Sequence, residues 1–160
     1  MSFSPDGKLL ATGGGDGAAK LWDIATGQAK ATLKGHLNRV TAITFSADGK
    51  TLVTGGADSV IKLWDIATGK ETGTLRGRMS GGITCVALSS DGRALATASV
   101  DGTIKLWNAA TGQERASLKS NLGAVWSVAF TPDCRMLATG GEEGNVKLVD
   151  IAKGISRASM

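Results

Sequence analysis

KLWDIATG at residues 20–27 recurs as KLWDIATG at 62–69, as KLWNAATG at 105–112 and as KLVDIAKG at 147–154, in steps of 42, 43 and 42 residues. A second segment keeps the same step: FSPDGKLLATGG (3–14), FSADGKTLVTGG (45–56), LSSDGRALATAS (88–99) and FTPDCRMLATGG (130–141). Self-similarity at a period of about 20–50 residues is the signature of a repeat architecture. The repeats cover nearly the whole chain, so the sequence predicts one array of four units without a linker or second domain.

Each period divides into four short apolar segments. In the second period they occupy residues 40–46, 50–56, 60–66 and 70–75. The residues between them are Ala-Asp-Gly, Ala-Asp-Ser and Ala-Thr-Gly, which are typical of hairpin turns. No helical periodicity interrupts the pattern. The sequence therefore predicts an all-β chain with one four-stranded antiparallel sheet per period.

The first segment of each period indicates how the sheets pack. In the second period one face carries Ile43 and Phe45, and the other carries the smaller Ala42 and Thr44. A strand that is apolar on both faces is buried on both faces. Large side chains opposite small ones suit sheets stacked at roughly 10 Å. The fourth segment is polar, as expected of an outer edge strand that avoids further pairing.

The repeats resemble the WD-repeat β-propeller family. Its signature is Gly-His before the first strand and Trp-Asp at the end of the third, matched here by Gly35-His36 and Trp64-Asp65. The resemblance implies four β-propeller blades at residues 1–33, 36–75, 78–118 and 121–160. The first blade lacks most of its inner strand. Since rings of this family usually have about seven blades, four blades predict an open arc or half-propeller.

The resemblance also implies a buried hydrogen-bond network in each blade. The second blade has all four members, His36, Thr54, Asp58 and Trp64. A closed network of this kind satisfies every buried polar group. The other blades are incomplete, and their residues at these positions are Thr12, Asp16 and Trp22; Arg78, Thr97, Asp101 and Trp107; and Asn121, Thr139, Glu143 and Val149. We expect rigidity to be highest in the second blade.

Composition narrows the class of protein. The net charge is +4 and the pI about 9.3, but the basic residues are evenly spread, with Lys20, Lys62, Lys105 and Lys147 at one repeat position. Even spacing indicates solvated or snorkelling strand positions, so we expect no nucleic-acid partner. No apolar run of roughly 18 residues is present, so we expect no membrane span. The absence of an apolar signal segment predicts a cytoplasmic protein if Met1 is the true start.

No residue pattern indicates catalysis. His36 could in isolation be a general base, but its Gly-His context favours a structural relay. The GGGDG run at 13–17 lacks the Lys-Ser/Thr of a phosphate-binding loop. Cys85 and Cys134 fit no metal or redox motif and are expected to be free thiols. We therefore expect no catalytic residues, no metal and no cofactor.

The leading hypothesis is a non-catalytic protein–protein interaction scaffold. In the family, partners dock on the top face, near the start of the first strand and the turn between the second and third strands. The candidates there are Arg39, Thr41, Thr84, Trp126 and Glu142. Arg and Trp are frequent interface anchors. The alternative for Trp126 is that it fills space between blades. A protein or peptide partner is expected on this face.

Other hypotheses remain open at this stage. The chain could be a truncated fragment of a longer propeller or multidomain protein, or a propeller enzyme with a site in the central channel. An open arc exposes apolar faces at both ends, which predicts that the isolated chain either forms a homodimer that closes a larger ring or is poorly soluble. Cys134 stands where the other periods have Gly after Asp, so a strained positive φ is expected there.

Overall fold

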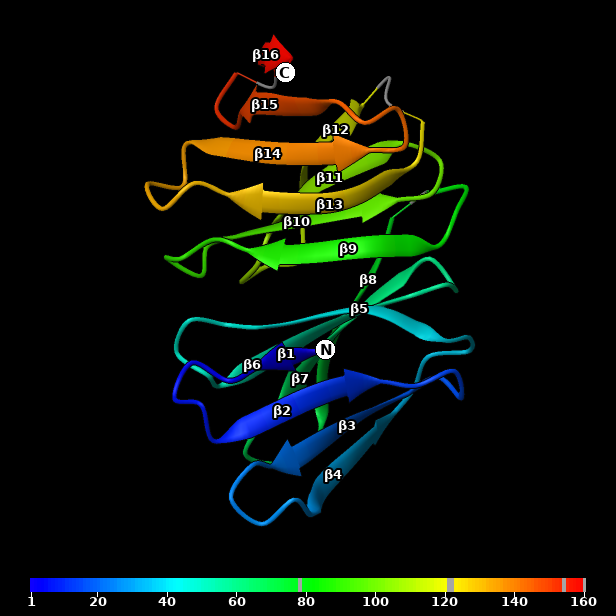
Figure 1. Cartoon of the computed structure of the whole chain (residues 1–160), viewed down its shortest axis with the longest axis vertical. Helices are drawn as coiled ribbons and strands as arrows, with labels where there is room; N and C mark the ends of the chain where they lie inside the picture. The colour runs from blue at the N-terminus through cyan, green and yellow to red at the C-terminus, as the bar shows by residue number, and fades with distance from the viewer. Residues whose placement is uncertain (78, 121–122, 154, 160) are drawn as a thin grey trace.

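The computed structural model describes residues 1–77, 79–120, 123–153 and 155–159, the last of these by their backbone only. These residues form four four-stranded antiparallel sheets, each with its strands in chain order, and the described part of the chain contains no helix (Figure 1). The all-β prediction is therefore confirmed. We call the sheets blades 1 to 4 in chain order.

The strands of blades 1 and 2 are β1 (Ser2–Phe3), β2 (Leu9–Gly13), β3 (Ala18–Asp23), β4 (Ala29–Lys34), β5 (Val40–Phe45), β6 (Thr51–Gly56), β7 (Val60–Asp65) and β8 (Glu71–Arg76). Those of blades 3 and 4 are β9 (Ile83–Leu88), β10 (Ala94–Ser99), β11 (Thr103–Asn108), β12 (Glu114–Lys119), β13 (Val125–Phe130), β14 (Met136–Gly141), β15 (Val146–Asp150) and β16 (Ile155–Ser159). In the second period the predicted bounds agree with these to within one residue.

The turns follow from short polar side chains and glycine. Between β5 and β6, Ser46 Oγ donates to Asp48 Oδ1 at 2.6 Å, and Gly49 takes a φ of +69°. Glycine reaches this left-handed region without a Cβ penalty. Cys134 holds the equivalent position in blade 4 at a φ of +58°. The predicted positive φ at Cys134 is thus confirmed.

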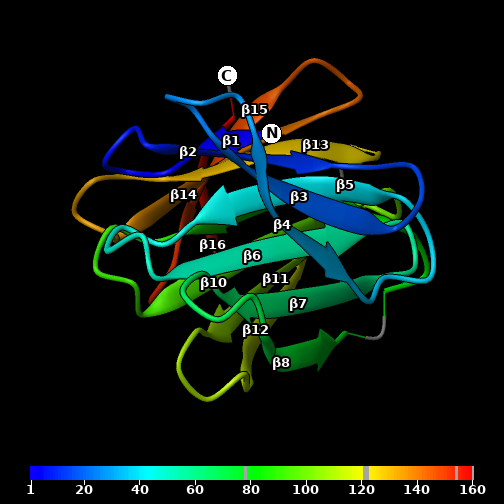
Figure 2. The ribbon, with the colours of Figure 1, turned by 90° about the horizontal axis from the view of Figure 1, so that it is seen from below.

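Successive blades pack face to face along the arc (Figure 2). Between blades 1 and 2, Phe45 and Trp64 of blade 2 pack against Ala11, Leu21 and Leu33 of blade 1. Similar clusters join blade 2 to blade 3 and blade 3 to blade 4. Each interface combines alanines of the earlier blade with large apolar side chains from both blades, so the large-against-small pattern of the inner strand describes only part of the packing.

The arc is open, with blade 1 (blue) and blade 4 (orange to red) at its two ends (Figure 1). Phe3 of blade 1 is 63% exposed, whereas its repeat equivalent Phe45 is 7% exposed. Val146 of blade 4 is 39% exposed, whereas its equivalent Ile61 is fully buried. We call these surfaces the N-terminal end face (Phe3, Leu10, Trp22, Ile24) and the C-terminal end face (Ala129, Ala138, Val146, Leu148).

Candidate functional site

Blade 2 holds a continuous hydrogen-bond network of four side chains. Trp64 Nε1 donates to Thr54 Oγ1 at 2.9 Å, and Thr54 Oγ1 lies 2.8 Å from His36 Nε2. His36 Nδ1 is 3.1 Å from both carboxylate oxygens of Asp58. A consistent proton arrangement has the Thr54 hydroxyl donating to Nε2 and Nδ1–H donating to Asp58. The imidazole is therefore engaged at both nitrogens and is a structural relay.

Asp58 ties this network to the backbone. Its carboxylate also accepts the N–H of Leu37 at 2.8 Å and that of Val60 at 3.2 Å. Burial raises the pKa of Asp58, but hydrogen bonds from Leu37 and His36 outweigh it and place the pKa below its usual range. A carboxylate that accepts several hydrogen bonds stays ionised. Asp58 thus joins the loop before β5 to the β6–β7 turn.

Blades 1 and 3 contain partial networks. Trp22 donates to Thr12 at 2.8 Å, and Trp107 donates to Thr97 at 3.0 Å. In blade 3, Ser99 Oγ donates to the Asp101 carboxylate. Arg78, which stands at the histidine position of blade 3, lies outside the described residues.

Ser99 occupies the repeat position of Gly56. A Cβ at Gly56 would lie 2.5 Å from His36 Nδ1, so a side chain at this position and the histidine exclude each other. Burial raises the pKa of Asp101, but the hydrogen bond from Ser99 and those from Thr103 and Ser80 lower it far below its usual value. Ser99 therefore gives Asp101 a hydroxyl partner where blade 2 uses a histidine.

The described residues of blade 4 form no network of this kind. Val149 stands in place of Trp64, and Glu143 is exposed. Thr139 Oγ1 is buried without a hydrogen-bond partner among the described residues. Asn121, at the histidine position, lies outside those residues. Within the described residues, Thr139 therefore lacks the partners that Thr54 has in blade 2.

Thr41 and Thr84, two of the top-face candidates, link neighbouring blades. Each is the bulged residue of its inner strand, because the pairing register skips it. Thr41 Oγ1 donates to the Ile83 carbonyl of blade 3, and Thr84 Oγ1 donates to the Val125 carbonyl of blade 4. These hydroxyls hold the inner strands together, a structural role that the sequence did not reveal.

Trp126 is the equivalent bulged residue of blade 4. Its side chain is 55% exposed at the C-terminal end of the arc, where no further blade is present, so a role in binding stays a prediction. Arg39 and Glu142 are also exposed. Two of the five candidates, Thr41 and Thr84, therefore bond to the next blade, although Thr41 is also exposed, and the other three are exposed without such a bond among the described residues.

The sequence matches the family described as the IFT122 first beta-propeller over residues 1–159. The chain belongs to this family of WD-repeat β-propellers.

Two curated relatives share single repeats with this WD-repeat protein. Human WD repeat-containing protein 86 is 54% identical over 41 residues, which cover 26% of this chain and 11% of that protein. The probable serine/threonine-protein kinase PkwA of Thermomonospora curvata is 48% identical over 42 residues, which cover 26% of this chain and 6% of that protein.

A solved structure shares the whole arc. One chain in the crystal structure of the mitotic checkpoint complex matches with a TM-score of 0.92 and 26% identity, over 99% of this chain and 49% of that chain. The WD-repeat protein therefore spans about half of that solved chain, with the same curvature.

The prediction that the evenly spaced lysines of this WD-repeat protein are solvated or snorkelling was wrong for two of them. Lys20 is exposed, but Lys62 and Lys105 are 9% and 5% exposed. Lys62 Nζ lies 2.7 Å from Glu71, and Lys105 Nζ lies 2.6 Å from Glu114. The recurrence of Glu nine residues after Lys in both periods was the available signal.

These ion pairs pack against the blade tryptophans. Lys62 Nζ lies 6.0 Å from the Trp64 ring centroid. Burial raises the pKa of Glu71, but its hydrogen bonds from Lys62 and Thr74 prevail and lower it. The ion pair thus closes the outer side of the blade over the indole.

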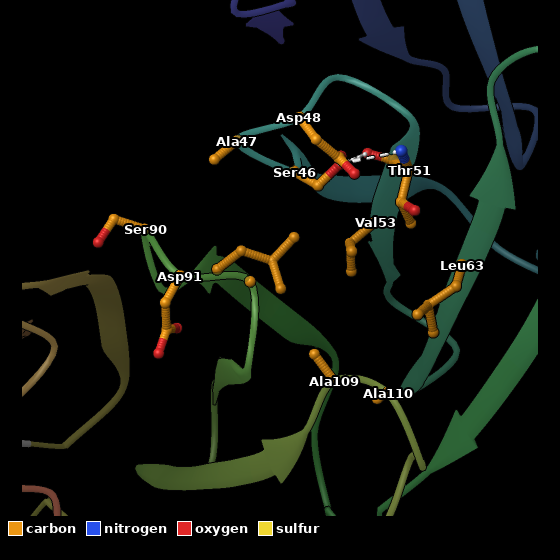
Figure 3. A pocket seen from close by; sticks show the side chains of 12 residues that line it. Ser46, Ala47, Asp48, Thr51, Val53, Leu63, Ser90, Asp91, Ala109 and Ala110 are labelled. Atoms are coloured by element: carbon orange, nitrogen blue, oxygen red, sulfur yellow. Dashed lines mark hydrogen bonds between the residues drawn. The ribbon is translucent and has the colours of Figure 1, made fainter.

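A cleft of about 400 Å³ lies between blades 2 and 3, beside their first turns (Figure 3). Ser46, Asp48 and Thr51 on one side bond to one another within their turn. Across the cleft, Ser90 Oγ donates to the Pro132 carbonyl at 3.0 Å. The Ser46 and Ser90 hydroxyls are thus engaged in bonds of the turns that border the cleft.

The described residues contain no cluster of three or more His, Cys, Asp or Glu side chains placed to hold a metal ion. Within the same part of the chain, no helix is long and apolar enough to cross a membrane.

Proposed function

We propose that this WD-repeat protein is a non-catalytic protein–protein interaction module that assembles through its two end faces with a second copy of itself. The supporting observation is that repeat positions buried or partly buried at the internal interfaces are exposed at the ends. Phe3, Ile24 and Val146 are 63%, 43% and 39% exposed. Exposed apolar surfaces of this kind are typical of interaction sites.

The two end faces have complementary chemistry. Phe3, Leu10, Trp22 and Ile24 occupy the repeat positions of Phe45, Leu52, Trp64 and Ile66, which pack on blade 1. Ala138, Val146 and Leu148 occupy the positions of Ala11, Ala19 and Leu21, which receive them. The N-terminal end face of one copy therefore fits the C-terminal end face of another. Two arcs related by a two-fold axis would close a ring of about eight blades.

The top face provides a second surface for a protein or peptide partner. Arg39 is exposed there beside Leu37, which is 93% exposed, and Val100 of the blade 3 turn is 49% exposed. Exposed Arg with large apolar side chains is the composition of interface anchors. Trp126 and Glu142 extend this surface at blade 4.

The non-catalytic part of the proposal rests on His36. Both ring nitrogens of His36 bond within the blade 2 network, and its side chain is 1% exposed. The relative named as a kinase matches over a 42-residue segment, the length of one repeat. That likeness therefore supports a shared repeat and not a shared active site.

Light scattering of the purified chain tests the assembly. We expect a particle of twice 16.3 kDa. Phe3→Glu, on the N-terminal end face, should give a monomer, because it would bury an unpaired charge in the joint. Leu37→Glu is the matched control, an exposed apolar side chain away from both end faces, and should leave the dimer intact. A wild-type monomer, or equal behaviour of the two variants, would contradict the proposal.

A further inference from the structure

The joint between blades 2 and 3 is filled differently from the other two joints of the arc. It contains the cleft of about 400 Å³ beside the first turns of the two blades. Leu63 of blade 2 and Leu88 and Ala109 of blade 3 line the apolar part of this cleft, and all three are partly exposed. Both blades have a neighbour on each side, so the cleft is formed without the ends of the chain.

Two lining side chains of blade 3 are smaller than their repeat equivalents. Ala109 stands at a position where each of the other blades has Ile, and Leu88 stands at one where each has Phe. The equivalents are Ile24, Ile66 and Ile151, and Phe3, Phe45 and Phe130. At the neighbouring joints these Ile and Phe side chains pack against the inter-blade clusters. The shorter side chains of blade 3 therefore leave space that is filled elsewhere in the arc.

The leucine on the blade 2 side of the cleft shows the effect of this space. Leu21 and Leu106, at the same repeat position, are 1% and 2% exposed. Ile66 packs against the cluster that contains the first of them, and Ile151 packs against the cluster that contains the second. Leu63 is only partly buried. The cleft thus has an apolar floor without the aliphatic side chain that packs there at the neighbouring joints.

Two carboxylates stand at the rim of the cleft. Figure 3 shows the turn with Asp48 and the turn with Asp91 on opposite sides, and both residues are exposed. Oδ1 of each accepts a serine hydroxyl at 2.6 Å and a backbone N–H at 3.0 Å within its own turn. The serine bonds are the main reason that the pKa of each carboxyl lies below its usual value, so both are ionised at neutral pH. Lys50 and Arg93, the basic residues of these turns, do not line the cleft.

We infer that this cleft binds an extended segment of a partner protein that carries one isoleucine or leucine between basic residues. The aliphatic side chain packs on Leu63 and takes the place that isoleucine fills at the neighbouring joints. The basic side chains reach the carboxylates of Asp48 and Asp91, whose Oδ2 atoms take no part in the turn bonds given above. An anchor in a pocket supplies most of the affinity, and complementary charges at the rim favour association and select the partner. This inference rests on the proposed function as an interaction module.

Fluorescence anisotropy with labelled peptides tests the inference on the full 160-residue chain. The peptide GKRIRKG should bind saturably. Its variant GKRARKG should bind about tenfold more weakly or less, because the aliphatic anchor is lost. A third peptide, GQQIQQG, keeps the anchor without the cations and should bind about threefold more weakly at low salt, with a smaller difference at high salt. These comparisons use unaltered protein, so they do not depend on the folding of a variant.

Two protein variants locate the site. Ala109→Ile restores the residue of the other three blades and should weaken binding of GKRIRKG by about tenfold or more, because the cleft is then filled from within. Ala67→Ile is the matched control, since Ala67 is exposed in the equivalent turn of blade 2 and does not line the cleft. It should leave binding unchanged. Thermal melts of both variants verify that they fold.

Three results would overturn the inference. They are equal binding of GKRIRKG and GKRARKG, full binding to a folded Ala109→Ile variant, and no saturable binding at millimolar peptide. Light scattering without peptide reports separately on the homodimer, so a failure of the assembly through the end faces and a failure of the cleft are distinguishable.

Discussion

Blade 2 and blade 4 have the same four strands and the same repeat, yet they differ in what surrounds them and in what lies inside. Blade 2 is covered on both faces and has the complete network around Thr54. Blade 4 is covered on one face, and its equivalent hydroxyl, Thr139, has no partner among the described residues. The repeat pattern therefore specifies the strands, whereas individual side chains and the adjacent blades determine the local stability of each blade.

The difference also separates two kinds of surface. In blade 2, a Cβ at Gly55 would lie 2.5 Å from Ile83 of the next blade, so the position is filled by its neighbour. In blade 4, the equivalent Gly140 has no atom near its Cβ site. An identical residue is thus part of an interior interface in one blade and part of an open end face in the other. This is the physical basis for the proposed assembly.

The largest effect should come from replacing the shared threonine. Thr54→Val removes the partner of both Trp64 and His36, so we expect the free energy of unfolding to fall by about 2–5 kcal/mol. Thr139→Val has the same shape change in blade 4 and should be neutral or stabilising, because no hydrogen bond within the described residues is lost. Urea denaturation of both variants measures the contrast. Equal losses would show that the network does not distinguish the two blades.

Replacing the histidine of the network should have the second largest effect on stability. We expect His36→Ala to lower the free energy of unfolding by about 1–3 kcal/mol, because Thr54 and Asp58 are left short of a partner. Gly56→Ser alone should also destabilise, since its Cβ would approach His36. The double variant should lose less than the sum of the two, because the new hydroxyl can bond to Asp58 as Ser99 does to Asp101. Additive losses in a double-mutant cycle would contradict this substitution of partners.

The two non-glycine residues with a positive φ, Ser59 and Cys134, should differ less in their effects on stability. Cys134→Gly relieves a non-glycine φ of +58°, and we expect a gain of roughly 1–2 kcal/mol. Ser59 of blade 2 has a φ of +61°, but its hydroxyl donates to the Gly81 carbonyl at 2.9 Å. Ser59→Gly loses that bond while relieving the strain, so its net change should be close to zero. Thermal melts of both variants test the difference, and a destabilised Cys134→Gly would be inconsistent with strain in that turn.

The smallest expected effect is on acid stability. Because the pKa of Asp58 is lower in the folded state, its contribution is present above its ordinary value and is lost as the pH falls through the folded value. In the Asp58→Asn variant, the free energy of unfolding should therefore decrease less steeply as the pH falls into the acid range. Above that range the variant should be less stable than the wild-type protein at every pH. Unfolding curves measured between neutral and acid pH give the comparison. If the free energy of unfolding of the variant falls with pH as steeply as that of the wild-type protein, Asp58 does not contribute to the acid dependence.

Much of the fold followed from the sequence, because repetition exposes strand, turn and network positions together. The strands and the positive φ of Cys134 were predicted from aligned periods, and the open arc was predicted from the resemblance to the WD-repeat family. The inter-blade bonds of Thr41 and Thr84 were not, because a β-bulge re-aims one residue and leaves no mark in the pattern. Nor were the buried pairs of Lys62 and Lys105, since burial of a charge depends on a partner from another strand. The accessible candidates Arg39, Trp126 and Glu142 remain predictions about binding.

Amide hydrogen exchange at low and high protein concentration tests most directly whether the ends of the arc are binding faces and blade 2 is an interior. We expect amides of β2 and β3 in blade 1, and of β14 and β15 in blade 4, to gain protection as concentration rises, because the end faces become covered. Amides of β6 and β7 in blade 2 should be well protected at both concentrations. Protection at the ends that does not change with concentration, or that changes equally in all four blades, would contradict the account.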